Sequence, residues 1–252
     1  MTTPTPSSNA LVDAHCHIDL YPSPEEIVKE AEAAGIFTIA VTNAPSVFFH
    51  TQAITRGCRF VRPAIGLHPE LVLSHGAEVE KIWPFLDETR YIGEIGLDYV
   101  TTSREERRRQ TEVFSKILEH CARYGNKVLT VHSRRSATDV IAAIGDHFPG
   151  VVILHWFSGS IKELRAALAY GMYFSVNTAM VESKNGQKLI AEMPRNRVFT
   201  ETDGPFVKVG SGPAKPPNVA NVVRYLAMAW GVSDDDARYA VAANFQAAIG
   251  QF

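Results

Sequence analysis

Residues 11–18 read LVDAHCHI, an apolar run that closes on two histidines separated by one residue. Ser23-Pro24-Glu25-Glu26 follows, with a serine that can cap a helix, a proline at the first helical position and a glutamate three residues after the serine. A buried strand followed closely by a helix is the repeating unit of parallel α/β folds. This stretch therefore predicts the first strand–helix unit of such a fold.

The same unit recurs along the whole chain. Eight runs have the apolar character of strands buried on both faces, and helical patterns separate them. The expected strands are Leu11–Ile18, Phe37–Asn43, Arg59–His68, Arg90–Asp98, Lys127–Arg134, Val151–Phe157, Tyr173–Asn177 and Val198–Asp203. Eight units in roughly 240 residues predict an α/β, single-domain (β/α)₈ barrel over residues 11–252, although a doubly wound sheet also fits the alternation.

Helix boundaries support this division. Ser103 and Ser160 each precede a glutamate by three residues, as in a capping box, while Gly35 and Gly171 stand where helices should end. Residues 103–124 carry an apolar stripe at helical spacing. The arginines at the start of this helix fit either a solvated helix start or a phosphate-binding patch. The glycine- and proline-rich stretch 204–217 is interpreted as an active-site loop.

Composition limits the class of protein. The chain is 46% hydrophobic and 21% charged, with a net charge of −2, which argues against a protein that coats nucleic acid through bulk positive charge. Its three cysteines lack CxxC spacing, which favours a reducing compartment, and we expect a cytoplasmic protein. Residues 1–10 are expected to form a disordered leader rather than a signal peptide. No run approaches the roughly 18 apolar residues of a membrane span.

Ionisable side chains gather at the ends of the expected strands. They are His15, His17, His68, Glu94, Asp98, His132, His155, Glu201 and Asp203. In a barrel these ends converge at the C-terminal mouth, where active sites of this fold lie. Imidazoles and carboxylates in apolar strands are costly unless they are paired or metal-bound. Four histidines with two carboxylates would supply a pair of divalent-metal sites.

The histidines can also be explained without a metal. A single histidine in a strand is more often a hydrogen-bonded core residue than a ligand, and His-x-His alone is a weak signal. The joint placement of five of the nine histidines at strand ends nevertheless favours a metal site. Cys16 is expected to point into the barrel wall as a buried apolar group. Four histidines are expected to be structural or solvated: His50, His75, His120 and His147.

Six short motifs carry a family resemblance. They are D-A-H-C-H-I-D (13–19), G-L-H-P (66–69), G-E-I-G-L-D (93–98), V-H-S-R (131–134), H-W-F-S-G (155–159) and E-T-D-G-P (201–205). In this order they resemble the TatD family of metal-dependent deoxyribonucleases, within the amidohydrolase-type barrels. The resemblance covers essentially the whole chain.

The resemblance implies two divalent metal ions, which could be Mg²⁺, Mn²⁺ or Zn²⁺. One would be held by His15, His17 and Asp203, the other by His132 and His155, with Glu94 bridging them. Asp203 would accept a proton from the attacking water, and Glu201 would orient that water or replace Asp203 in this role. Four further residues are expected on the substrate side: His68, Asp98, Arg134 and Trp156. Asp98 could also orient a ligating histidine.

The implied reaction is hydrolysis of phosphodiester bonds in DNA, with a single strand or a strand end as substrate, because a barrel mouth accepts a terminus more readily than mid-duplex. Hydrolysis of an amide, ester or aminoacyl bond remains an alternative, since the same metals polarise a carbonyl group. A third alternative is a scaffold or recognition subunit. Fold and ligands alone do not separate these functions.

A narrower resemblance lies in L-H-W-F-S-G-S (154–160), Y-F-S-V-N (173–177) and residues 193–206. These resemble the TatD-like member of the bacterial Qat anti-phage system, which implies antiviral defence and three partners: an ATPase, a QueC-like enzyme and a small fourth protein. Two features depart from the wider family. Trp156 stands where cysteine is commoner, and residues 206–218 replace a basic, asparagine-containing stretch, which leaves the substrate preference open.

Overall fold

Eight parallel strands alternate with helices through residues 10–250, the part of the chain described by the computed structural model. The strands are β1 (Val12–Cys16), β2 (Phe37–Val41), β3 (Val61–Ala64), β4 (Tyr91–Gly96), β5 (Lys127–His132), β6 (Gly150–His155), β7 (Tyr173–Val176) and β8 (Val198–Thr200). Of the expected leader, only Ala10 falls within the described residues, and it is buried. All eight expected strands are present.

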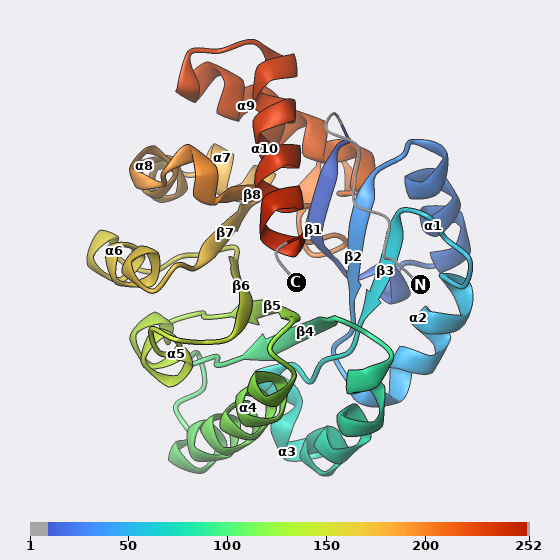
Figure 1. Ribbon diagram of the computed structural model, residues 1–252, viewed down its shortest axis with the longest axis vertical. Coiled ribbons are helices and arrows are strands. Elements are labelled where there is room, and N and C mark those ends of the chain that lie inside the picture. The colour runs from blue at the N-terminus through green and yellow to red at the C-terminus, as the bar shows by residue number, and fades with distance from the viewer. Residues whose placement is uncertain (1–9, 251–252) are drawn as a thin grey trace.

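Helices surround this wall of strands (Figure 1). The α-helices are α1 (Pro24–Ala33), α2 (Phe48–Ile54), α3 (Val72–His75), α4 (Arg104–Tyr124), α5 (Ala137–Ile144), α6 (Ile161–Ala169), α7 (Thr178–Glu182), α8 (Lys184–Glu192), α9 (Val219–Trp230) and α10 (Asp234–Ile249). Short 3₁₀ segments are η1 (Ile18–Leu20), η2 (Pro45–Val47), η3 (Pro69–Leu71), η4 (Gly76–Asp87), η5 (Arg195–Arg197) and η6 (Pro216–Asn218). None of the helices within residues 10–250 is long and apolar enough to cross a membrane.

The strands close into a barrel, which excludes the doubly wound alternative. Strands β1 to β3 form one parallel ladder and β4 to β8 another. The N–H of Ile65 donates to Tyr91 and the N–H of Gly93 donates to Ile65, joining β3 to β4 at 3.2 and 2.9 Å. At the other seam the N–H of Asp203 donates to the carbonyl of His15 at 2.9 Å. The predicted (β/α)₈ barrel is confirmed.

The strands end earlier than predicted, which is a correction to the expected boundaries. His17 lies just beyond β1, and His68 lies four residues beyond β3. Asp203 follows β8 with a φ of 48°, so the backbone has already left the extended conformation there. His15, Glu94, His132 and His155 thus lie within strands, whereas His17, His68, Asp98, Glu201 and Asp203 belong to the loops, where side chains need not alternate as they do along a strand.

Helix starts agree with the sequence in part. Ser160 forms a complete capping box with Glu163. Ser103 caps α4 with its side chain, but the carboxylate of Glu106 accepts instead from Thr101 Oγ1, and Ser23 makes no side-chain cap. The α4 stripe is buried as expected. The exposed Arg108 and the half-buried Arg109 pair with neighbouring glutamates on the same helix, which favours the solvated helix start.

Two glycines bring the barrel segments close together beneath the mouth. A Cβ on Gly66 would lie 2.3 Å from the carbonyl carbon of Gly93 and 2.4 Å from the backbone nitrogen of Glu94. A Cβ on Gly93 would lie 2.1 Å from the side chain of Thr130. Because these contacts involve backbone and packed side chain, only glycine fits at both positions. The close approach sets the position of Glu94.

Candidate metal centre

His15 and His17 form the first half of the centre. Their Nε2 atoms lie 3.1 Å apart, each buried at the end of β1. Glu94 Oε2 lies 3.7 and 3.3 Å from these two nitrogens, and Asp203 Oδ1 lies 3.7 and 3.5 Å from them. Ligands about 2.0–2.1 Å from a tetrahedral metal ion stand roughly 3.3–3.4 Å from one another. The four atoms therefore fit the donor set of a divalent cation.

The second half gathers around the other oxygen of Glu94. Glu94 Oε1 lies 2.8 Å from His132 Nδ1, 2.8 Å from His155 Nε2 and 3.3 Å from His68 Nε2. The two nitrogens of His132 and His155 are 3.3 Å apart. The carboxylate thus presents one oxygen to each half, and Asp203 Oδ1 has no hydrogen-bond partner although it is buried. The donor set fits two neighbouring cations.

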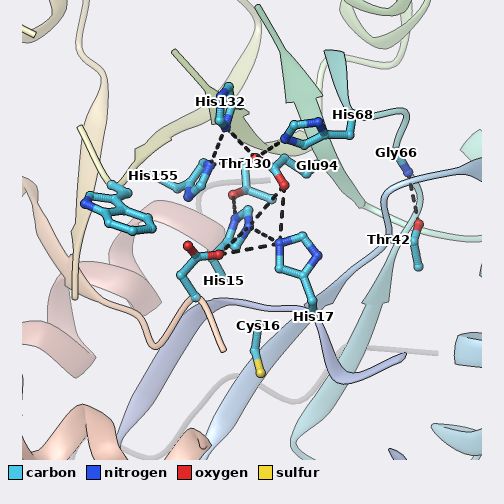
Figure 2. Close-up of polar contacts among 12 residues, drawn as sticks. His15, Cys16, His17, Thr42, Gly66, His68, Glu94, Thr130, His132 and His155 are labelled. Carbon is cyan, nitrogen blue, oxygen red and sulfur yellow. Dashed lines mark hydrogen bonds and ion pairs between the residues drawn. The ribbon is translucent and has the colours of Figure 1, made fainter. Parts of the chain in front are cut away.

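Figure 2 shows the imidazole rings converging on Glu94 from several strands, while Cys16 points away from them. The ring of His15 stacks on that of His155 at 3.8 Å, which ties β1 to β6 across the mouth. Cys16 is fully buried, and its sulfur faces the carbonyl oxygen of Gly204 at 3.7 Å. It lies in the barrel wall, as expected.

Two side chains behind the centre hold the histidine rings. Thr130 Oγ1 lies 2.6 Å from His15 Nδ1, and Asp98 Oδ2 lies 2.8 Å from His132 Nε2. Since an ionised carboxylate only accepts, His132 donates its Nε2–H to Asp98, and its Nδ1 faces Glu94 in the centre. Such contacts fix the tautomer and the orientation of a ligating imidazole.

Asp98→Asn is expected to weaken metal binding by roughly 10–100-fold while leaving the fold intact, because the charge that supports His132 is lost. Titration calorimetry with Zn²⁺ measures this change. Asp146→Asn, at an exposed carboxylate far from the mouth, should bind Zn²⁺ like the wild type. An unchanged affinity in Asp98→Asn would show that Asp98 does not position His132.

The centre carries compensating charges. Burial lowers the pKa of His15 to about 3, with the nearby His155 acting in the same direction. Burial alone would lower the pKa of His17, but hydrogen bonds with Asp203 and Glu94 raise it to about 10. Against the effect of burial, the surrounding histidines hold the pKa of Glu94 well below its usual value. Glu94 is therefore an anion. In the metal-free protein, the proton on His17 supplies part of the positive charge that metal ions would otherwise supply.

The metal-free protein should lose stability as the pH rises from about 6.5 to 10. Contacts with Asp98 and Glu94 overcome the effect of burial and raise the pKa of His132 to about 9, and that of His17 is also raised. Because unfolded histidine titrates near 6.5, the folded state binds more protons within this window, and unfolding becomes easier as they leave.

Thermal melts in EDTA at several pH values test this expectation. Asp98→Asn should flatten the pH dependence, since it removes one partner of His132. His147→Asn, at a side chain that is 92% exposed, should leave the dependence unchanged. A melting temperature that stays constant or rises over this range would contradict the expectation.

Glu201 lies behind the centre and not at the cavity, in contrast to the expected water-facing position. Its Oε1 accepts from the backbone N–H of Trp156 at 3.0 Å and from Asn177 Nδ2 at 2.9 Å, and Ser175 donates to Oε2. Burial raises the pKa of Glu201 well above its usual value. The side chain can support the residues around His155, but it does not reach the space in front of the histidines.

A cavity of about 460 Å³ opens in front of the centre. Its walls include the four expected substrate-side residues: His68, Asp98, Arg134 and Trp156. Leu71 and Phe206 also line it and were missed by sequence reasoning, although the stretch 204–217 was expected to reach the site. Phe206 precedes a small hairpin formed by β9 (Lys208–Val209) and β10 (Gly212–Pro213).

Two other supporting residues were missed. Thr130 stands two residues before His132 on β5, so strand periodicity could have placed it on the same face. Asp13 accepts hydrogen bonds from the N–H and the hydroxyl of Thr202 at 2.8 and 2.6 Å. These bonds link the segment that carries His15 and His17 to the segment that carries Asp203. Burial raises the pKa of Asp13 to about 7. The sequence offered no signal for this pairing, because the partners are 189 residues apart.

A (β/α)₈ barrel with histidines and carboxylates converging at its C-terminal mouth defines the class of metal-dependent hydrolases. Residues 12–250 match the family model of TatD-related DNases. The chain belongs to this family, and it is a metal-dependent hydrolase.

Relatives cover nearly the whole chain. Deoxyribonuclease TATDN3 of Homo sapiens is 26% identical over 90% of this chain and 89% of its own length. The uncharacterized metal-dependent hydrolase MJ1582 of Methanocaldococcus jannaschii is 27% identical over 86% of this chain and 87% of its own. The crystal structure of YJJV, a TatD homologue of Escherichia coli, superposes with a TM-score of 0.84 at 23% identity, covering 96% of this chain and 98% of the other.

Proposed function

We propose that the protein is a two-metal deoxyribonuclease that removes nucleotides from a strand end. The observation that carries the proposal is Glu94, whose two oxygens face two separate sets of imidazole nitrogens. A carboxylate is suited to this place because it binds two cations at once and offsets their mutual repulsion. Two neighbouring metal ions are the arrangement used for in-line displacement at phosphodiesters.

Six residues would hold the metal ions. His15, His17 and Asp203 would hold one metal ion, His132 and His155 would hold the other, and Glu94 would contact both. When bound, the ions would lower the pKa of water and neutralise charge on the phosphoryl oxygens.

Asp203 can accept the proton of the attacking water, since its buried carboxylate lies beside His15 and His17 at the centre. Arg134 and His68 line the cavity and can contact the substrate phosphate. His68 also lies beside Glu94 and His132 at ligand spacing, so its ring can contribute to the second metal set. Glu201 is proposed as a positioning residue rather than a base, since it contacts the backbone of Trp156.

The strand-end preference rests on the size and place of the cavity. A space of about 460 Å³ at one mouth of a barrel accommodates a terminal residue, whereas an intact duplex would have to pass across the rim. A deoxyribonuclease relative covering 90% of this chain supports DNA as the substrate.

We further propose a role in anti-phage defence, together with an ATPase, a QueC-like enzyme and a small fourth protein. The support is the resemblance in residues 154–160, 173–177 and 193–206. Replacing His15 and His17 together should abolish phage resistance while preserving the complex. Undiminished resistance in that double variant would favour a scaffolding role.

The direct test is an assay on labelled single strands and duplex ends with Mg²⁺, Mn²⁺ or Zn²⁺. The expected result is release of nucleotides from single-stranded ends, blocked by EDTA and restored by excess metal. A protein that binds metal but is inert towards every nucleic acid would contradict the proposal and favour hydrolysis of an amide, ester or aminoacyl bond.

A further inference from the structure

Two large aromatic side chains stand exposed at the cavity in front of the metal centre. Trp156 is 38% exposed and Phe206 is 57% exposed, and both line the cavity. Each lies close in sequence to an expected ligand, since Trp156 follows His155 directly and Phe206 comes three residues after Asp203. Ligand pockets are lined predominantly by hydrophobic and aromatic side chains, so two exposed rings at this cavity can serve as a binding surface.

Both residues are held in place by the backbone of the centre. The N–H of Trp156 donates to Glu201 at 3.0 Å, and its φ of 37° is unusual for a residue other than glycine. The N–H of Phe206 donates to the carbonyl of Asp203 at 3.0 Å. The Phe206 ring meets the ring of His17 edge-on, with centroids 5.0 Å apart. The backbone of both residues is therefore fixed at the cavity wall, and the Phe206 ring is also held against His17.

The charges around the cavity leave little attraction for a long phosphate chain. Arg134 is the one arginine or lysine among the lining residues, and Glu70 adds a carboxylate at the rim. At the start of α4, Arg108 and Arg109 are paired with Glu105 and Glu112 along their own helix, and Arg107 donates to the carbonyls of Tyr99 and Thr101. Beyond the scissile phosphate, which the metal ions, Arg134 and His68 would contact, the wall offers few partners for further phosphates, and ring stacking is the other contact that it can supply.

We propose that Trp156 and Phe206 stack on the base of the terminal nucleotide, so that the enzyme selects unpaired, base-bearing strand ends. The inference rests on the proposed deoxyribonuclease function. Stacking accepts every base because each has a π-face, so we expect little sequence preference. A paired end would be a poorer substrate, because its terminal base must first leave the duplex stack.

Kinetics on matched single strands test the proposal. One strand ends in a normal nucleotide, and the other ends in an abasic residue with the same phosphodiester. Trp156→Ala and Phe206→Ala should each raise KM for the normal strand by about 5–50-fold, with kcat little changed. Neither substitution should affect the abasic strand, which the wild type itself should bind weakly.

Two controls separate stacking from structural damage. Trp156→Phe keeps an aromatic face and should restore most of the affinity lost in Trp156→Ala. Tyr239→Ala removes an exposed aromatic ring on α10, outside the cavity, and should behave as wild type. Equal losses on the normal and the abasic strand would show a structural role and overturn the proposal.

Fluorescence gives a readout that needs neither metal nor catalysis. In EDTA, a trithymidylate should quench tryptophan emission of the wild type, and a trinucleotide with an abasic end should not. Trp156→Phe should abolish the quenching, although Trp83 and Trp230 remain. Quenching without any DNA cleavage would refute the proposed function and leave the stacking site standing. Cleavage of DNA without quenching, and without a KM effect of either variant, would refute the stacking site alone.

Discussion

Glu94→Ala should abolish metal binding and hydrolysis together, with activity expected to fall by at least about 10³-fold. The reason is geometric, because Oε2 faces His15 and His17 while Oε1 faces His132 and His155. Removing the carboxylate leaves both cation sets without their shared anion. Calorimetric titration with Zn²⁺ and a nuclease assay measure the two losses on the same protein.

Glu94→Gln separates charge from shape in this experiment, since the amide keeps the volume of the carboxylate and loses its charge. We expect it to lose activity nearly as fully as Glu94→Ala. Glu192→Gln, at a surface glutamate paired with Arg165, serves as the matched control and should retain full activity. Full activity in either Glu94 variant would contradict the two-metal arrangement.

Gly66→Ala should strongly destabilise the barrel near the mouth. The new Cβ would lie 2.3 Å from the carbonyl carbon of Gly93 and 2.4 Å from the nitrogen of Glu94, and backbone cannot yield as a flexible side chain does. A clash of this kind costs roughly 3–5 kcal/mol. At this chain length each kcal/mol corresponds to about 2–4 °C, so the melting temperature should fall by roughly 10 °C.

Gly212→Ala is the control for this substitution. Gly212 lies in β10, and a Cβ there would have nothing within 4 Å. In circular dichroism melts, Gly212→Ala should keep the wild-type melting temperature, and Gly66→Ala should melt roughly 10 °C lower. A Gly66→Ala protein with the wild-type melting temperature would show that the barrel can absorb the added methyl group. If Gly66→Ala folds at low temperature, weakened Zn²⁺ binding should accompany its lower stability, since the same contact places Glu94.

The barrel could be predicted because its signals are local. Each strand is a short apolar run, and each helix begins or ends with recognisable residues such as Ser160 or Gly171. The ends of strands were less predictable, because an apolar run continues into the loop when the loop is itself buried. His17 and Asp203 show this, as both are buried after the strand has ended.

The orientation of Glu201 could not be predicted by strand periodicity. Alternation suggested that Glu201 and Asp203 face the same way, but β8 ends at Thr200 and the chain turns at Asp203, where φ is 48°. Asp203 therefore faces His15 and His17, while Glu201 faces the backbone of Trp156. Side-chain alternation applies only while the backbone stays extended.

The contacts of Asp98 and His68 required the structure for a different reason. Both were expected near the substrate, and Asp98 was also expected to orient a ligating histidine, but sequence does not show which histidine or carboxylate a loop residue meets. Asp98 contacts the far nitrogen of His132, and His68 reaches Glu94. These partners lie 26 to 34 residues away, and the distances between them depend on how two loops bend over the mouth.

The seam between β1 and β8 gives the centre a dependence on chain completion. His15 and Asp203 are joined at this point because the N–H of Asp203 donates to the carbonyl of His15. Beside it, Asp13 accepts hydrogen bonds from the backbone N–H and the hydroxyl of Thr202. A growing polypeptide that has not yet released Asp203 from the ribosome can hold at most part of the donor set. Full metal affinity is thus expected only once the barrel has closed. Bound metal would in turn stabilise the contact between β1 and β8 against opening.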